Sequence, residues 1–253
     1  MRNLTLKRYV RILLFLLLYY GYGQDANHES SLLIKYDQML GPEKTSLYKG
    51  ILYTQKYRMQ EDNHMFFKSY HTLIGALTYD HQPYYRQKIK YDIVQDQIII
   101  TLKNSLNRDN VLIINKSKVS SMIIDRHRFV RTDAYMPKTD TYKINSFLEI
   151  LLESNDITFL KSHKKSIRET IKNRSILRKF VIRTAYFLHV DNTFYRIKSR
   201  KHILKIFREY KSELRAIRKG TQLLSNDEEL FLYMLKRVEV LQNQNKETEV
   251  RKV

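Results

Sequence analysis

The sequence contains no cysteine and no tryptophan, and it has only 3 prolines and 6 glycines among 253 residues. Without cysteine the chain forms no disulfide and carries no lipid on an N-terminal cysteine. A zinc site would need histidine and carboxylate ligands alone. The chain is instead rich in Lys, Ile, Asn and Tyr, a bias that an A/T-rich coding sequence produces by drift.

Short motifs of known chemistry are also missing. The chain has no HExxH, GxSxG, GxGxxG or phosphate-binding GxxxxGK pattern. His64, His71 and His81, with Asp80, come nearest to a metal-binding cluster, but single histidines are more often surface or hydrogen-bonded residues. We therefore predict that the protein is not an enzyme and has no metal and no cofactor. A hydrolase without a recognisable motif remains the alternative.

The first 23 residues have the three-part layout of a secretory signal. Basic residues precede an apolar and aromatic run over 12–20, and glycines at 21 and 23 predict cleavage between Gly23 and Gln24. The apolar core is too short for a hydrocarbon layer that needs about 20 residues, although an uncleaved anchor is the alternative. We predict an exported protein, periplasmic or secreted, that is not an integral membrane protein after cleavage.

Short alternating runs fill residues 47–198 and predict an antiparallel sheet. Residues 85–94 and 98–102 alternate between apolar and polar side chains on either side of a turn, which is typical of a hairpin with one buried face. Residues 147–153 and 157–161 predict another hairpin. We expect about eight to ten short strands in a curved sheet, a sandwich or a partial barrel, within an α+β fold that is mainly antiparallel β.

A further hairpin is predicted where residues 186–190 and 193–198 flank Asp191 and Asn192. These two residues tolerate the positive φ angles of a tight two-residue turn. The pattern indicates two paired strands rich in aromatic and β-branched residues.

Two amphipathic helices are predicted to follow and to close the sheet. From Ser199 apolar residues recur at helical spacing up to Gly220, which favours a single basic helix. Ser225 and Glu228 form a capping box for a second helix that ends near Leu241.

These patterns divide the chain into five expected segments. They are a signal peptide (1–23), an exposed lead-in (24–46), an antiparallel β domain (47–198), a helical pair packed on the sheet (199–241) and a disordered tail (242–253).

Positive charge is concentrated in one part of the chain. The formal net charge is +20, and residues 161–219 alone have +15. Within them 163–178 is a basic block that we interpret as a surface loop or a short helix. A charged segment of this kind is either a solvated surface or a site for anions. The candidate anion-binding residues are Lys164, Lys165, Arg168, Lys172, Arg174, Lys205, Arg208, Arg215 and Lys219.

Two functional hypotheses of different class follow. The first is an exported, non-catalytic envelope protein that acts as a scaffold or binds a partner protein or a small ligand. The second is a binder of anionic partners such as lipopolysaccharide phosphates, another anionic glycolipid, a membrane surface or a polyanion. Nucleic acid fits the charge but not the compartment, so we do not expect it as a partner.

Four stretches of the chain resemble a family of signal-peptide-bearing exported proteins found widely in Bacteroidota. They are 47–58, 65–85, 87–101 and 186–220. The resemblance extends over 47–241. It implies export and a β-rich fold, it implies no known activity, and no functional residue can be transferred from it.

Overall fold

The computed structural model describes four stretches of the chain, 26–135, 144–172, 175–220 and 226–250. The predicted leader, 1–23, and its cleavage site between Gly23 and Gln24 lie outside them.

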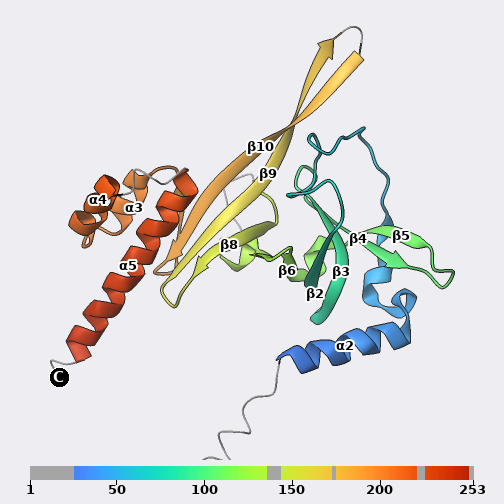
Figure 1. The fold of residues 1–253 in the computed structure, drawn as a ribbon, viewed down its shortest axis with the longest axis horizontal. Helices are drawn as coiled ribbons and strands as arrows, with labels where there is room; N and C mark the ends of the chain where they lie inside the picture. The colour runs from blue at the N-terminus through green and yellow to red at the C-terminus, as the bar shows by residue number, and fades with distance from the viewer. Residues whose placement is uncertain (1–25, 136–143, 173–174, 221–225, 251–253) are drawn as a thin grey trace, which may run out of the picture.

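Eleven strands of the described chain form one open antiparallel sheet, in the order β1-β5-β4-β3-β2-β6-β7-β8-β9-β10-β11 (Figure 1). The strands are β1 (Ile51–Leu52), β2 (Leu73–Tyr79), β3 (Gln82–Asp92), β4 (Gln97–Lys103), β5 (Asp109–Ile114), β6 (Val119–Ile124), β7 (His127–Arg131), β8 (Phe147–Glu153), β9 (Ile157–Lys172), β10 (Ser175–Val190) and β11 (Thr193–Ile197). The prediction of a mainly antiparallel α+β fold is confirmed.

The helices lie at the two ends of the described chain (Figure 1). They are α2 (Ala26–Leu40), α3 (Arg200–Ile206), α4 (Lys211–Gly220) and α5 (Asp227–Val250), with short 3-10 turns at η2 (Pro42–Lys44), η3 (Ser46–Lys49), η4 (Lys116–Lys118) and η5 (Thr132–Ala134). The segment 24–46, predicted as an exposed lead-in, thus contains a helix and a 3-10 turn. Gly41, with a φ of 82°, separates the two.

The predicted hairpins form because their turn residues accept left-handed backbone. Asp191 and Asn192 have φ angles of 49° and 57°, and Val190 pairs directly with Thr193 across them. Asp96 has a φ of 56° in the turn between β3 and β4. The two-residue turn at Asp191 and Asn192 follows the right-handed twist of the flanking strands, whereas a four-residue connection, 93–96, joins β3 to β4.

The largest core lies on one face of the bent sheet. It collects alternate residues from β2 to β8, among them Leu77, Tyr84, Ile89, Tyr91, Ile98, Ile100, Met122, Phe129 and Phe147. The bend brings β9 to the end of β3, although four strands lie between them in the sheet order. There the Lys165 backbone N–H donates to the carbonyl oxygen of Ile93 at 3.0 Å.

A second core lies where the C-terminal helices cover the end of the sheet. Phe159, Leu188 and Ile197 of the last three strands contact apolar residues of all three helices. The prediction of a single helix over 199–220 is wrong. One helix ends at Ile206 and the next begins at Lys211.

The break between α3 and α4 lies within the second core. Phe207 and Tyr210, on either side of it, are both buried in the second core together with Ile203 and Leu214. A single straight helix would also place these four residues on one side, since they are spaced i, i+4, i+7 and i+11, so their spacing did not reveal the break.

The prediction of a disordered tail over 242–253 is also wrong for most of that range, since α5 continues to Val250. Contacts with the rest of the protein explain the extra turns. Lys246 Nζ lies 2.5 Å from a carboxylate oxygen of Asp156, and the Asn245 amide donates to the Tyr210 hydroxyl at 3.2 Å. Neither partner is near in sequence, so local pattern alone did not indicate them.

β9 and β10 are the longest strands, and their outer parts leave the sheet. β8 pairs with β9 no further than Ser162, and β11 pairs with β10 only from Tyr186. Residues 163–172 and 175–185 therefore form a two-stranded ribbon, here called the arm, which projects from the body (Figure 1). The interpretation of 163–178 as a loop or short helix was wrong. Ile167 and Ile171 lie on the same face of β9 as Glu169, and because their spacing of four also fits a helix, the sequence alone did not identify the strand.

We expect Gly75→Ala to destabilise the fold by about 1 to 3 kcal/mol. A Cβ on Gly75 would lie 2.2 Å from the backbone oxygen of Ile123 on β6, which has no freedom to move aside. Urea unfolding measures the effect, and Ser120→Ala at an exposed position of β6 is the control. Equal stability of Gly75→Ala and the unmodified protein would contradict this account of the β2-β6 contact.

Candidate functional site

The register of the arm gathers cations on one of its faces. Lys164 pairs with Arg183, and Arg168 pairs with Lys179. Residues directly opposite in an antiparallel pair project to the same side, and positions four apart in a strand share that side. These four residues therefore form one surface, here called the cationic face. Arg168, Lys179 and Arg183 are exposed, and Lys164 is half-buried.

Like charges lie directly opposite one another on the cationic face. Like charges directly opposite one another destabilise a strand pair. The sequence of the arm has one acidic residue, Glu169, and its register partner is Arg178. The Arg178 Nε donates to Glu169 at 2.6 Å, and this pair projects from the other face of the arm. The only described acid of the arm thus does not neutralise the cationic face.

Polar contacts attach the base of the arm to the segment that precedes β2. The Lys165 ammonium donates to the backbone oxygens of His64 at 2.7 Å and Phe66 at 2.9 Å. The Asn63 side chain donates to the Arg178 oxygen at 2.8 Å and accepts from the Phe180 N–H at 3.0 Å. These hydrogen bonds pair the edge of β10 with the segment before β2. They fix the direction in which the arm leaves the body.

Lys165 is one of the predicted anion-binding residues, but its ammonium group binds backbone oxygens of the protein and holds the base of the arm. Burial lowers the pKa of its ammonium group, since the charged form loses water contacts. Two of its three N–H donors are directed at backbone oxygens of the protein. Lys165 points to the face opposite Lys164 because successive residues of a strand alternate in direction.

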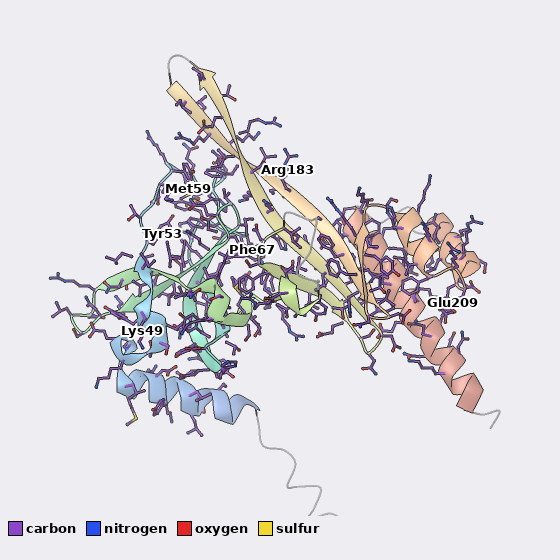
Figure 2. The ribbon with its side chains drawn as sticks, turned by 180° about the vertical axis from the view of Figure 1, so that it is seen from behind. Lys49, Tyr53, Met59, Phe67, Arg183 and Glu209 are labelled. Atoms are coloured by element: carbon purple, nitrogen blue, oxygen red, sulfur yellow. The ribbon has the colours of Figure 1, made fainter. Side chains whose placement is uncertain are left out.

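An apolar cluster lies under the base of the arm. Phe180 and Ile167 pack against Met59, Met65 and Phe66, and the Tyr57 ring meets Phe180 edge-on with centroids 6.1 Å apart. Figure 2 shows Met59 near the base of the arm and Arg183 on the arm itself. The contacts hold the face that carries Lys165 against the body, which leaves the cationic face outward.

A buried carboxylate lies next to this cluster at the end of β3. One oxygen of Asp92 accepts from the N–H groups of Val94 at 2.8 Å and Gln95 at 2.9 Å. Its other oxygen and the Tyr53 hydroxyl have no partner among the described residues. Burial raises the pKa of Asp92 to about 6, despite the two hydrogen bonds that favour the ionised form.

The predicted cations of the helices lie apart from the arm. Lys205 belongs to α3, Arg215 to α4, and Arg208 to the break between them, and all three are exposed. Figure 2 places Glu209, beside Arg208, at the helical end and Arg183 on the arm. The side chains of Lys172, Arg174 and Lys219 lie outside the described residues. Those of the nine predicted residues whose side chains the structure describes do not form one continuous site.

The structure also brings together a buried acid and two histidines that the sequence did not connect. Glu149 of β8 accepts at 2.5 Å from Nδ1 of His127 on β7 and at 2.5 Å from Nε2 of His163 on β9. Burial by itself would raise the pKa of Glu149, but these hydrogen bonds outweigh it and lower the pKa. The one signal in the sequence was an acid within the apolar run 147–153.

The group formed by Glu149, His127 and His163 stabilises the base of the arm. The ring of Phe67 meets His127 and His163 edge-on, with centroids 5.2 Å and 4.8 Å apart, so both imidazoles are held in place. In the described parts of the chain no three His, Asp or Glu side chains are grouped as metal ligands. We interpret the Glu149 group as a link between three strands.

The histidines singled out in the sequence do not gather. His64 is buried beside Phe66, and burial with the nearby Lys165 and Lys90 charges lowers its pKa to about 4. The ring of His71 lies 2.8 Å from Glu61 at the surface, and His81 lies in the turn between β2 and β3.

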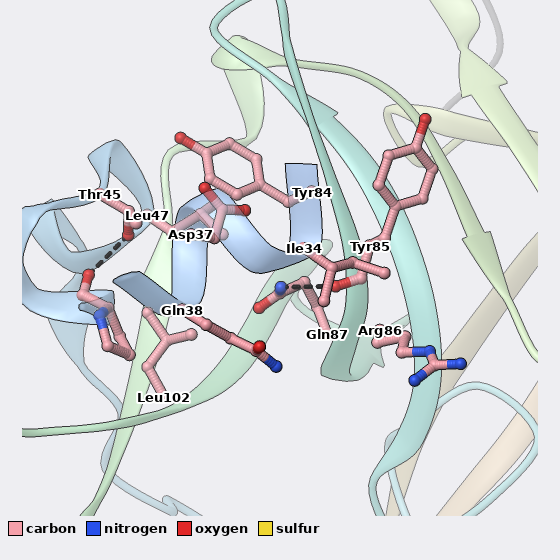
Figure 3. Close-up of a pocket in the computed structure, with 11 residues that line it drawn as sticks. Ile34, Asp37, Gln38, Thr45, Leu47, Tyr84, Tyr85, Arg86, Gln87 and Leu102 are labelled. Atoms are coloured by element: carbon pink, nitrogen blue, oxygen red, sulfur yellow. Dashed lines mark hydrogen bonds between the residues drawn. The ribbon is translucent and has the colours of Figure 1, made fainter. Parts of the chain in front are cut away.

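A pocket between α2 and β3 is another concave candidate (Figure 3). Ile34, Asp37 and Gln38 of α2 face Tyr84 and Gln87 across it, and its volume is about 170 Å³. Ligand pockets generally enclose about 300 to 1,000 Å³. Burial raises the pKa of Asp37. The described lining of the pocket contains no second carboxylate and no histidine that could act with it as an acid or base.

Comparison with protein-family models, with curated proteins and with solved structures gives no match for this chain. The resemblance to exported proteins of Bacteroidota therefore stays a prediction. Within the described ranges no helix is both long and apolar enough to span a membrane.

We expect Asp92→Asn to stabilise the protein at neutral pH by about 1 to 3 kcal/mol. Above pH 6 the folded state has a buried charge that the asparagine lacks. Below pH 6 the folded Asp92 takes up a proton before the unfolded one does, so the difference disappears as the pH approaches 4. Urea unfolding at pH 8 and at pH 4 measures both values.

Asp96→Asn is the matched control because Asp96 is hydrogen-bonded to Lys116 and Ser146, which outweigh its burial and lower its pKa. This variant should be less stable than the unmodified protein at pH 8. A loss of stability in Asp92→Asn at pH 8 would contradict the assignment of Asp92 as an unfavourable buried charge.

Proposed function

We propose that this protein is an exported, non-catalytic binding protein of the cell envelope, and that it binds an anionic partner through the cationic face of the arm. The observation that carries the proposal is the direct opposition of Lys164 to Arg183 and of Arg168 to Lys179. The exposed side chains of Arg168, Lys179 and Arg183 offer charge-assisted hydrogen-bond donors to phosphate or sulfate groups.

The spacing of the cationic face favours a partner with several anionic groups. Opposite side chains are about 5 Å apart at Cβ, and the two cation pairs are four residues apart, about 13 Å along the ribbon. One small anion does not bridge that length. Repeated phosphates, as on an anionic glycolipid layer or a polyanion, contact both pairs at once.

Export is part of the proposal and is supported by the leader and by the absence of cysteine. The partners expected from the sequence, lipopolysaccharide phosphates and anionic membrane surfaces, belong to that compartment. On the same basis we propose that the chain belongs to the family of exported Bacteroidota proteins that it resembles.

Binding to heparin and to vesicles that contain phosphatidylglycerol tests the proposal. Replacing Arg168, Lys179 and Arg183 with Gln should weaken vesicle binding by about 100-fold, because each basic residue near an anionic surface contributes about 1 kcal/mol. The dependence of affinity on salt should also become shallower, since fewer counterions are displaced.

The helical end supplies a control with the same change in charge. Replacing Lys205, Arg208 and Arg215 with Gln removes three exposed cations at another part of the molecule and should weaken binding much less. Equal losses in the two triple variants would mean that net charge alone matters. A greater loss in the helical variant would place the site on α3 and α4 and reject the arm.

A further inference from the structure

The pocket between α2 and β3 has polar side chains whose donors are partly used within the protein. The Thr45 hydroxyl donates to the backbone oxygen of Pro42 at 2.6 Å, and the Gln87 amide nitrogen donates to the backbone oxygen of Tyr85 at 2.8 Å. A hydroxyl has a single hydrogen, so Thr45 offers only lone pairs to a ligand. Figure 3 shows the Gln87 side-chain oxygen on the side away from Tyr85, toward Gln38 of α2.

The same pocket contains a carboxylate that has no cation beside it. The half-buried carboxylate of Asp37 forms no ion pair and no side-chain hydrogen bond within the described chain, and burial alone accounts for its raised pKa. Arg86 also lines the pocket, but Figure 3 shows its guanidinium group directed away from Asp37. Asp37 is therefore available as a charged acceptor for a ligand.

Apolar side chains complete the lining. Ile34 comes from α2, Leu47 from η3 and Leu102 from β4, and the enclosed volume is about 170 Å³. Drug-sized ligands occupy pockets of about 300 to 1,000 Å³, so a much smaller molecule fits here. The apolar lining favours an organic cation with a short hydrocarbon chain over a metal ion, because a metal ion gains nothing from such contacts.

We propose that this pocket binds a small molecule in which a primary ammonium group ends a short apolar chain. An ammonium group has three N–H donors and no acceptor, which complements the Asp37 carboxylate and the oxygens of Thr45 and Gln87. Its bond to Asp37 is charge-assisted and therefore stronger than a neutral hydrogen bond. Figure 1 shows α2 at the other end of the sheet from the arm, so this site is separate from the cationic face.

Titration of the isotope-labelled full-length protein with n-butylammonium chloride, followed by NMR, tests the proposal. The backbone amide signals of residues 34–38 and 84–87 should shift saturably, with a dissociation constant of about 1 mM, an affinity that so small a ligand can reach. n-Butanol has the same chain without the charge, and butyrate has the opposite charge. Both should bind at least about tenfold more weakly, because neither forms a charge-assisted bond with Asp37.

Two variants locate the site. Asp37→Asn keeps the size of the side chain but removes its charge, and it should weaken n-butylammonium binding by about tenfold or more. Ile34→Phe keeps the charge but fills the pocket, and it should weaken binding as well. Asp62→Asn, at an exposed position outside the lining, is the control with the same change in charge and should bind normally. Urea unfolding of each variant checks that it is folded.

The proposal holds if the shifts are confined to the pocket and both pocket variants weaken them. It is wrong if no saturable shifts occur, if n-butanol binds equally well, or if folded Asp37→Asn binds like the unmodified protein. Shifts centred on another part of the chain would also overturn it. None of these results affects the proposed function, which heparin and vesicle binding test separately.

Discussion

The arm has a fixed position because Lys165 is bound through both its backbone and its side chain. Its N–H donates to Ile93 at the end of β3, and its ammonium donates to the oxygens of His64 and Phe66. One residue thereby joins β9, the far strand β3 and the segment before β2. Charge-assisted hydrogen bonds of this kind are stronger than neutral ones. The orientation of the cationic face follows, since Lys164 has to point the other way.

Buried polar groups are concentrated around this connection. Glu149 links β7, β8 and β9 through two histidines, and Asp92 lies at the end of β3 with one oxygen unpartnered among the described residues. Both oxygens of Glu149 are hydrogen-bonded, and this group stabilises the base of the arm. Asp92 instead has a buried charge that is unfavourable.

The sequence predicted elements whose information is local. The turn at Asp191 and Asn192 and the alternation around Asp96 are short-range patterns, and both hairpins formed as expected. The break between α3 and α4 has no glycine or proline to mark it, and the residues on either side, Phe207 and Tyr210, keep the spacing of one continuous apolar stripe. The last turns of α5 depend on contacts with Asp156 and Tyr210, which no local pattern contains.

The candidate site was predicted in composition but not in arrangement. The excess of positive charge after residue 161 was apparent, but it took the pairing of β9 with β10 to divide the cations between two faces and to separate the arm from the helices. Lys165 shows why, because its neighbour Lys164 differs from it only in the direction that the strand imposes. Net charge cannot distinguish two such residues, whereas strand register can.

Hydrogen exchange of the backbone amides, with and without vesicles that contain phosphatidylglycerol, tests the central claim most directly. The account predicts slower exchange along the arm, in residues 164–171 and 176–184, with no change in α3 and α4. Protection of the helical end with an unchanged arm would contradict it.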